Sequence, residues 1–102
     1  MNPLQSRYAN KVAVITGAGG GIGRAACVRL ASEGASIVAV DLDETALAET
    51  AELVEGAGAA VHSVIADVGD ASQVRQYVDE AVASFGGIDL LFNNAGIMGQ
   101  VA

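Results

Sequence analysis

The chain has 102 residues, of which 52% are hydrophobic and 17% charged, and its formal net charge at pH 7 is −7. This acidic balance argues against nucleic acid or an anionic membrane as the partner, and no apolar run approaches the ~20 residues of a membrane span. The polar N-terminal segment lacks the apolar core of a signal peptide, and Cys27 is the single cysteine, so we expect a cytoplasmic protein without an internal disulfide.

Strand-like and helix-like segments alternate along the chain after a polar arm over residues 1–10. Apolar runs predict strands over 11–16, 36–41, 61–67 and 88–93. Amphipathic segments predict helices over 22–33, from a cap at Asp43 to about 55, and from a cap at Asp70 to 85. Glycines follow or end each of these helices. We therefore expect one α/β domain over residues 11–102.

The alternation of strands and helices also predicts how the strands are ordered. Strands joined by helices form a parallel sheet with right-handed crossovers. In a doubly wound sheet the first three strands lie in the order 3-2-1, and the fourth lies on the other side of the first. We expect this order, 3-2-1-4, with the third strand at one edge. Ligands of such sheets bind at the carboxyl end of the first strand, where the order reverses.

The segment 16–23, Thr-Gly-Ala-Gly-Gly-Gly-Ile-Gly, lies at that point. Glycine permits positive φ and leaves no Cβ between backbone and ligand, and the helix N-terminus that follows stabilises an anion. Because Ile22 breaks the G-x-G-x-x-G spacing, the spacing that fits is T-G-x-x-x-G-x-G, with Gly17, Gly21 and Gly23. A P-loop is excluded because there is no Gly-Lys pair, and a flexible linker would not stand between a strand and an amphipathic helix. The segment predicts a turn that binds a dinucleotide pyrophosphate.

Asp41 ends the second predicted strand and indicates which dinucleotide binds. A carboxylate there accepts hydrogen bonds from both ribose hydroxyls of an adenosine and repels a 2′-phosphate. Gly20 and Leu42 supply no cation for such a phosphate. The alternative role for Asp41 is to start a turn or cap the next helix, but Asp43 is the better cap candidate. We therefore predict NAD, rather than NADP, as the cofactor.

Two further polar segments follow predicted strands. Asp67 can accept a hydrogen bond from an adenine amino group, with Val68 packed beside it, although a turn-forming aspartate is the alternative. Asn93 and Asn94 end the fourth strand, where consecutive amides can tie neighbouring strand ends together. The Ala-Gly pair at 95–96 then lets a ribose lie against bare backbone. Taken alone, the 93–96 segment is also typical of a turn.

Together these segments resemble the short-chain dehydrogenase/reductase (SDR) family. The resemblance covers about residues 11–98, and the residues that carry it are Thr16-Gly17-x-x-x-Gly21-Ile22-Gly23, Asp41, Asp67-Val68 and Asn93-Asn94-Ala95-Gly96. It implies a Rossmann-type fold and an NAD-dependent oxidoreductase that transfers hydride between the nicotinamide and a small alcohol or ketone substrate. It also implies a homo-oligomer, a dimer or a tetramer.

The resemblance assigns roles to individual residues. It implies that the turn residues Gly17, Gly20, Gly21 and Gly23 hold the pyrophosphate, and that Ile22 lies under the nicotinamide. By the same likeness, Asp41 binds the adenosine ribose, Asp67 and Val68 contact the adenine, and Asn94 lies near a ribose.

The family's catalytic residues are a serine and a Tyr-x-x-x-Lys pair, and none is expected in this chain. Neither Tyr8 nor Tyr77 fits the pattern, because Val12 and Ala81 stand four residues later. The resemblance places all three beyond the fourth strand. We therefore expect the chain to be the N-terminal, cofactor-binding part of a longer protein and to be inactive alone. A bare apolar edge on the fourth strand favours the same interpretation.

Two other functions stay open at this point. A non-catalytic dinucleotide-binding module has the same turn without the catalytic residues. A methyltransferase also has a glycine turn, but usually with an acidic residue ahead of it, where this chain has Ile15-Thr16. No metal site is expected. The remaining conspicuous side chains are interpreted as structural, and they are His62, Cys27, Glu44, Glu49, Glu52 and Glu55.

Overall fold

The structure is a computed structural model, and it describes residues 7–94. Strands and helices alternate along this part of the chain, as the sequence predicts. In chain order they are β1 (Val12–Thr16), α1 (Gly21–Ser32), β2 (Ser36–Asp41), α2 (Glu44–Gly56), β3 (Val61–Ile65), α3 (Ala71–Phe85) and β4 (Leu90–Asn93).

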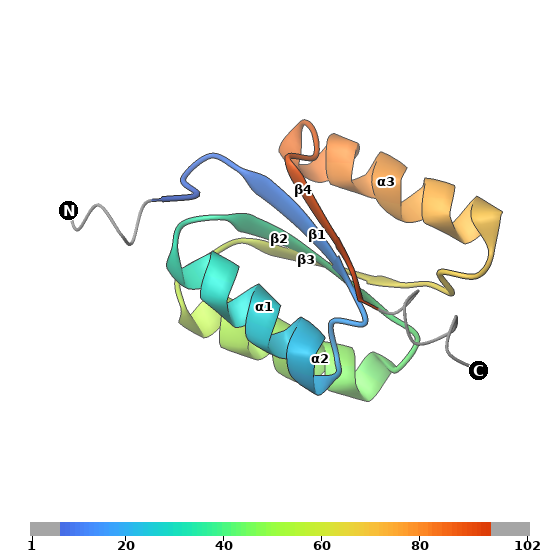
Figure 1. Cartoon of the computed structure of the whole chain (residues 1–102), viewed down its shortest axis with the longest axis horizontal. Coiled ribbons are helices and arrows are strands. Elements are labelled where there is room, and N and C mark those ends of the chain that lie inside the picture. The colour runs from blue at the N-terminus through green and yellow to red at the C-terminus, as the bar shows by residue number, and fades with distance from the viewer. Residues whose placement is uncertain (1–6, 95–102) are drawn as a thin grey trace.

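The four strands form one parallel sheet in the order β3-β2-β1-β4, which confirms the predicted doubly wound order. Helices α1 and α2 cover one face of the sheet, and α3 covers the other (Figure 1). The register places Thr16 at the end of β1 opposite Val40 of β2 and Asn93 of β4. The carboxyl ends of the three strands therefore meet at one edge of the sheet, beside the glycine turn.

Alternate residues of the central strands build two separate hydrophobic layers. Ile15 and Ile37 point toward α1 and α2, where they pack with Leu47. Val14 and Val38 point to the opposite face and pack with residues of α3. Burying each such side chain contributes roughly 1.5–3 kcal/mol. The central strands are apolar on both faces because helices cover both faces.

Cys27 lies in the α1 layer with no exposed surface, which confirms its interpretation as a small core residue. Burial raises the pKa of its thiol to about 12, so the side chain stays protonated at neutral pH. A protonated, buried thiol is neither a nucleophile nor a metal ligand.

Two strands are shorter than predicted, and hydrogen bonds at their ends explain both differences. Strand β3 ends at Ile65 rather than at 67, because the backbone N–H of Asp67 donates to Gln73 Oε1 (2.6 Å) as the chain turns toward α3. Strand β4 begins at Leu90 rather than at 88. Asp89 precedes it and bonds Val12 twice: Asp89 N donates to Val12 O, and Asp89 Oδ2 accepts from Val12 N, both at 2.8 Å.

Both predicted aspartate caps are confirmed. Asp43 Oδ1 accepts from Ala46 N (3.0 Å) at the start of α2, and Asp70 Oδ1 accepts from Ser72 N (2.9 Å) at the start of α3. Helix α1 begins at Gly21, one residue ahead of the predicted start, with Gly20 as its N-cap and no side chain that caps it. In the part of the chain that the structure describes, no helix is both long and apolar enough to cross a membrane.

Candidate functional site

The glycines of the segment 17–23 fall into two groups, and the first group is required by the fold. Gly17 has φ of +66°, which side-chain-bearing residues rarely adopt. A Cβ at Gly23 would overlap the carbonyl oxygen of Gly17, so only glycine lets α1 pack this closely on the turn. A Cβ at Gly19 would lie 2.8 Å from Cβ of Ala46 on α2. These positions shape the turn.

The second group, Gly20 and Gly21, faces open space. Both residues are exposed, and a Cβ built at Gly21 meets no atom within 4 Å. The first N–H groups of a helix have no partner within it, and the N-cap Gly20 carries no side chain to accept from them. The backbone is therefore bare at the positive end of the α1 dipole, where a phosphate is stabilised.

Asp41 lies at the end of β2 and reaches the glycine turn. Its Oδ2 accepts from Gly19 N (2.8 Å), and its Oδ1 accepts from Asp43 N (2.9 Å). The alternative, turn-forming role is therefore present, and the side chain also reaches the glycine turn, while its binding of a ribose stays a prediction. An ionised carboxylate has about four lone-pair positions, so these two bonds leave two acceptor positions on a partly exposed side chain.

Two residues that the sequence analysis missed also hold the turn. Thr50 of α2 donates from Oγ1 to Ala18 O (2.8 Å), and Arg24 of α1 donates from Nε to Thr50 Oγ1 (2.9 Å). Thr50 is fully buried. The sequence contains one indication of this role: Thr50 is a polar residue on the apolar face of α2, at the helical spacing of Leu47 and Val54.

Asp67 and Val68 lie beyond the end of β3, at the same edge of the sheet. Asp67 Oδ1 accepts from Gly69 N (2.8 Å), so the turn-forming role is present. Its carboxylate is exposed and retains further acceptor positions. Val68 is partly buried and packs against the layer under α3.

The end of β4 is tied to the end of β1. Thr16 Oγ1 donates to Asn93 Oδ1 (3.1 Å), which confirms that an amide joins these strand ends. Asn94 follows and is partly buried. The Ala-Gly pair at 95–96 lies outside the described residues. Ile22, at the start of α1, is 69% exposed, so its side chain is accessible to a ligand.

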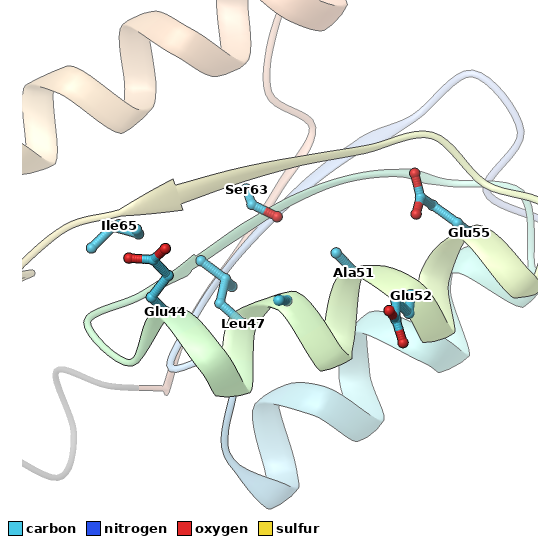
Figure 2. A pocket seen from close by; sticks show the side chains of 8 residues that line it. Glu44, Leu47, Ala51, Glu52, Glu55, Ser63 and Ile65 are labelled. Atoms are coloured by element: carbon cyan, nitrogen blue, oxygen red, sulfur yellow. The ribbon is translucent and has the colours of Figure 1, made fainter.

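The surface also has a groove, which lies apart from the predicted site residues. This groove of about 360 Å³ runs between α2 and β3, and its lining includes Leu47, Ala51, Ser63, Ile65, Glu44 and Glu52 (Figure 2). None of the predicted site residues lines it. The glutamates of α2 are exposed, as expected of a solvated helix face.

His62 of β3 belongs to a surface pair. Its Nε2 lies 2.7 Å from Glu80 Oε1 on α3, and this hydrogen bond holds the pKa of Glu80 below its usual value. Among residues 7–94, no group of three or more His, Cys, Asp or Glu side chains is arranged to hold a metal ion.

The chain is similar to known proteins over nearly its whole length. Residues 11–102 match the family model described as "short chain dehydrogenase". Levodione reductase of Leifsonia aquatica is 46% identical over 97 residues, which cover 93% of this chain and 36% of that protein.

Solved structures have the same fold. Carveol dehydrogenase from Mycobacterium avium, in complex with NAD, matches with a TM-score of 0.84 and 37% identity over 88% of this chain and 37% of that one. NAD⁺-bound xylitol dehydrogenase matches with a TM-score of 0.85 and 42% identity over 87% of this chain and 34% of that one. The chain thus spans little more than a third of the length of these proteins.

Proposed function

The chain belongs to the short-chain dehydrogenase family, and from this we propose that it is the cofactor-binding part of an NAD-dependent oxidoreductase that acts on a small alcohol or ketone. The observation that carries the proposal is the bare backbone at Gly20 and Gly21, at the positive end of α1 and next to the Asp41 carboxylate. A pyrophosphate and a ribose diol need these two features side by side.

The described residues fit a dinucleotide at several points. Gly17, Gly19 and Gly23 shape the turn, while the N–H groups at the start of α1 would hold the pyrophosphate. The two acceptor positions left on Asp41 match the two hydroxyls of the adenosine ribose. Asp67 and Val68 would contact the adenine, Ile22 would lie under the nicotinamide, and Asn94 would lie near a ribose. The bound nicotinamide supplies the hydride acceptor or donor of the reaction.

The charges around Asp41 favour NAD over NADP. A 2′-phosphate would meet the carboxylate of Asp41, which reaches the glycine turn. The nearest cation on α1, Arg24, is engaged by Thr50 Oγ1, Ala46 O and the carboxylate of Glu49. Gly20 contributes no side chain. NAD-bound structures among the relatives support the same choice.

Titration calorimetry with NAD and with NADP tests the proposal. We expect NAD to bind at least tenfold more tightly, and Asp41→Ala to reduce that preference by about tenfold, because one charge repulsion and two charge-assisted hydrogen bonds are lost. Glu52→Ala, which removes an exposed carboxylate of α2 that lies apart from the predicted site residues, is the control and should keep the preference. Equal binding of NAD and NADP by the unaltered protein would contradict the choice of NAD.

The relatives' names describe reductases and dehydrogenases, which favours an enzyme over a non-catalytic module. The complete protein is proposed to act in the cytoplasm as a homo-oligomer, a dimer or a tetramer. Its serine and Tyr-x-x-x-Lys residues would be encoded downstream of the described part. Finding them in the gene, together with NAD-dependent alcohol oxidation, would separate the enzyme from the module.

A further inference from the structure

The glycine segment contains a β-turn whose central peptide is held from both sides. Gly20 N donates to Gly17 O (3.2 Å), so Ala18 and Gly19 are the two central residues of the turn. The carbonyl oxygen of their shared peptide accepts from Thr50 Oγ1 (2.8 Å), and its N–H donates to Asp41 Oδ2 (2.8 Å). One peptide unit thus joins a buried hydroxyl of α2 to the carboxylate at the end of β2.

Without these two hydrogen bonds, the Ala18–Gly19 peptide would rotate easily. Rotation of the central peptide converts a type I turn into a type II turn, and its usual obstacle is that the third turn residue must adopt positive φ. Gly19 holds that position, and glycine adopts positive φ at little cost. Gly19 nevertheless has no positive φ here, although Gly17 does. The hydrogen bonds to Thr50 and Asp41 hold the peptide in this orientation and oppose its rotation.

Arg24 directs the Thr50 proton toward the turn. Thr50 has one hydroxyl proton and two carbonyl oxygens within reach, Ala18 O at 2.8 Å and Ala46 O at 3.2 Å. Arg24 has only donors: its Nε gives a proton to Thr50 Oγ1, and its Nη2 gives one to Ala46 O (3.0 Å). Because Ala46 O already accepts a hydrogen bond from Arg24, the hydroxyl proton of Thr50 goes to the nearer Ala18 O.

We propose that Thr50, oriented by Arg24, is a positioning residue for the dinucleotide: it holds the Ala18–Gly19 peptide, and through that peptide it fixes the Asp41 carboxylate that selects NAD. The inference rests on the proposed function of the turn. If the peptide rotated, Gly19 N–H would no longer point to Oδ2 of Asp41. The carboxylate would then turn about its remaining bond to Asp43 N and present its acceptors to the ribose less often.

The test compares two Thr50 variants in the full-length protein that contains this chain. Thr50→Val keeps the shape but removes the hydroxyl, and Thr50→Ser keeps the hydroxyl. We expect Thr50→Val to weaken NAD binding roughly tenfold, the size of effect left by one unsatisfied buried acceptor, and to lower the NAD-over-NADP preference severalfold. Thr50→Ser should retain both. Thr45→Val, the same change at an exposed position of α2, is the control.

Amide hydrogen exchange provides a readout that does not depend on the ligand. The Gly19 amide should exchange faster in Thr50→Val than in the unaltered protein and in Thr50→Ser, while the amide of Val38 in the sheet stays protected. Arg24→Gln should also make the Gly19 amide exchange faster, and it leaves Thr50 itself unaltered. This variant replaces Thr50→Val in the test if Thr50→Val does not fold.

The outcomes separate the inference from the function on which it rests. If the unaltered protein binds neither NAD nor NADP, the proposed function fails, and the exchange of Gly19 alone decides whether Thr50 holds the peptide. If NAD binds but Thr50→Val keeps its affinity, its preference and Gly19 protection, the positioning role is wrong. Equal losses in Thr50→Val and Thr50→Ser would also overturn it, because the hydroxyl would not be the cause.

Discussion

At the scale of single residues, the glycines of the turn have different physical reasons for being glycine. Gly17 needs positive φ, Gly23 needs close packing against the turn, and Gly21 has free space around it. From the spacing alone these positions are equivalent members of one motif. Their differences depend on what surrounds each Cα after folding, and they lead to opposite expectations for the same substitution.

Alanine at Gly23 and at Gly21 forms a matched pair. We expect Gly23→Ala to lower the free energy of unfolding by roughly 1–3 kcal/mol, because the added methyl overlaps the Gly17 carbonyl and forces the backbone to move. Gly21→Ala should leave stability unchanged or raise it by up to ~1 kcal/mol, because alanine favours the helix, but should weaken NAD binding. Urea unfolding and calorimetry measure both. A stable Gly23→Ala variant would show that the packing there is looser than described.

At the scale of elements, aspartate caps define where two helices begin. Asp70 caps α3, and its pKa is lowered chiefly by the hydrogen bond from the Ser72 hydroxyl and then by that from Ser72 N–H. A carboxyl group whose pKa is lower in the folded state stabilises that state above its unfolded pKa of about 3.9. That stability is lost as the pH falls through the folded pKa.

Asp70→Asn therefore changes how stability depends on pH. The variant keeps a capping oxygen but does not titrate, so the difference in unfolding free energy between the two proteins should shrink as the pH falls below ~4. Thermal unfolding between pH 7 and pH 3 measures this. Asp79→Asn, on the same helix outside the cap, is the control. A difference that stays constant with pH would mean that the cap does not depend on the charge.

The predicted elements follow from local chemistry, which explains why they were found. Apolar runs and the caps Asp43 and Asp70 act within a few residues, so their signal is present in the sequence. The errors lie at the end of β3 and the start of β4, where Asp67 bonds Gln73 of α3 and Asp89 bonds Val12 of β1, so both boundaries depend on another element. The role of Thr50 was missed for the same reason, because its partner Ala18 comes from another element.

At the scale of the whole molecule, the sheet ends at β4 with apolar side chains on its surface. Leu90 is 40% exposed and Leu91 is 54% exposed, and within residues 7–94 no strand lies on the outer side of β4. An exposed apolar edge strand pairs with other chains unless another segment covers it. The bare edge that the sequence predicts is therefore confirmed for the described residues.

The 102-residue chain should consequently associate as its concentration rises. We expect Leu91→Lys to reduce this association, because a charge at a sheet edge opposes pairing, while the free energy of unfolding changes by less than ~1 kcal/mol. Leu53→Lys, at a 48% exposed position on α2, is the matched control and should associate as the unaltered chain does. Light scattering over a concentration series measures both. Equal effects of the two substitutions would indicate non-specific apolar contact instead of edge pairing.

The sequence by itself determined the elements, the strand order and the candidate residues at the carboxyl edge of the sheet. These follow from periodicity, capping and connection rules that act locally or depend only on the order of elements. Only after folding does it become clear which glycines face open space and which pack against the protein. The tertiary structure also decided that Asp41 is held by the turn through Gly19, and that Thr50 and Arg24 hold the turn in place. Such contacts join residues from different elements, and their geometry exists only once α1, α2 and β2 have packed together.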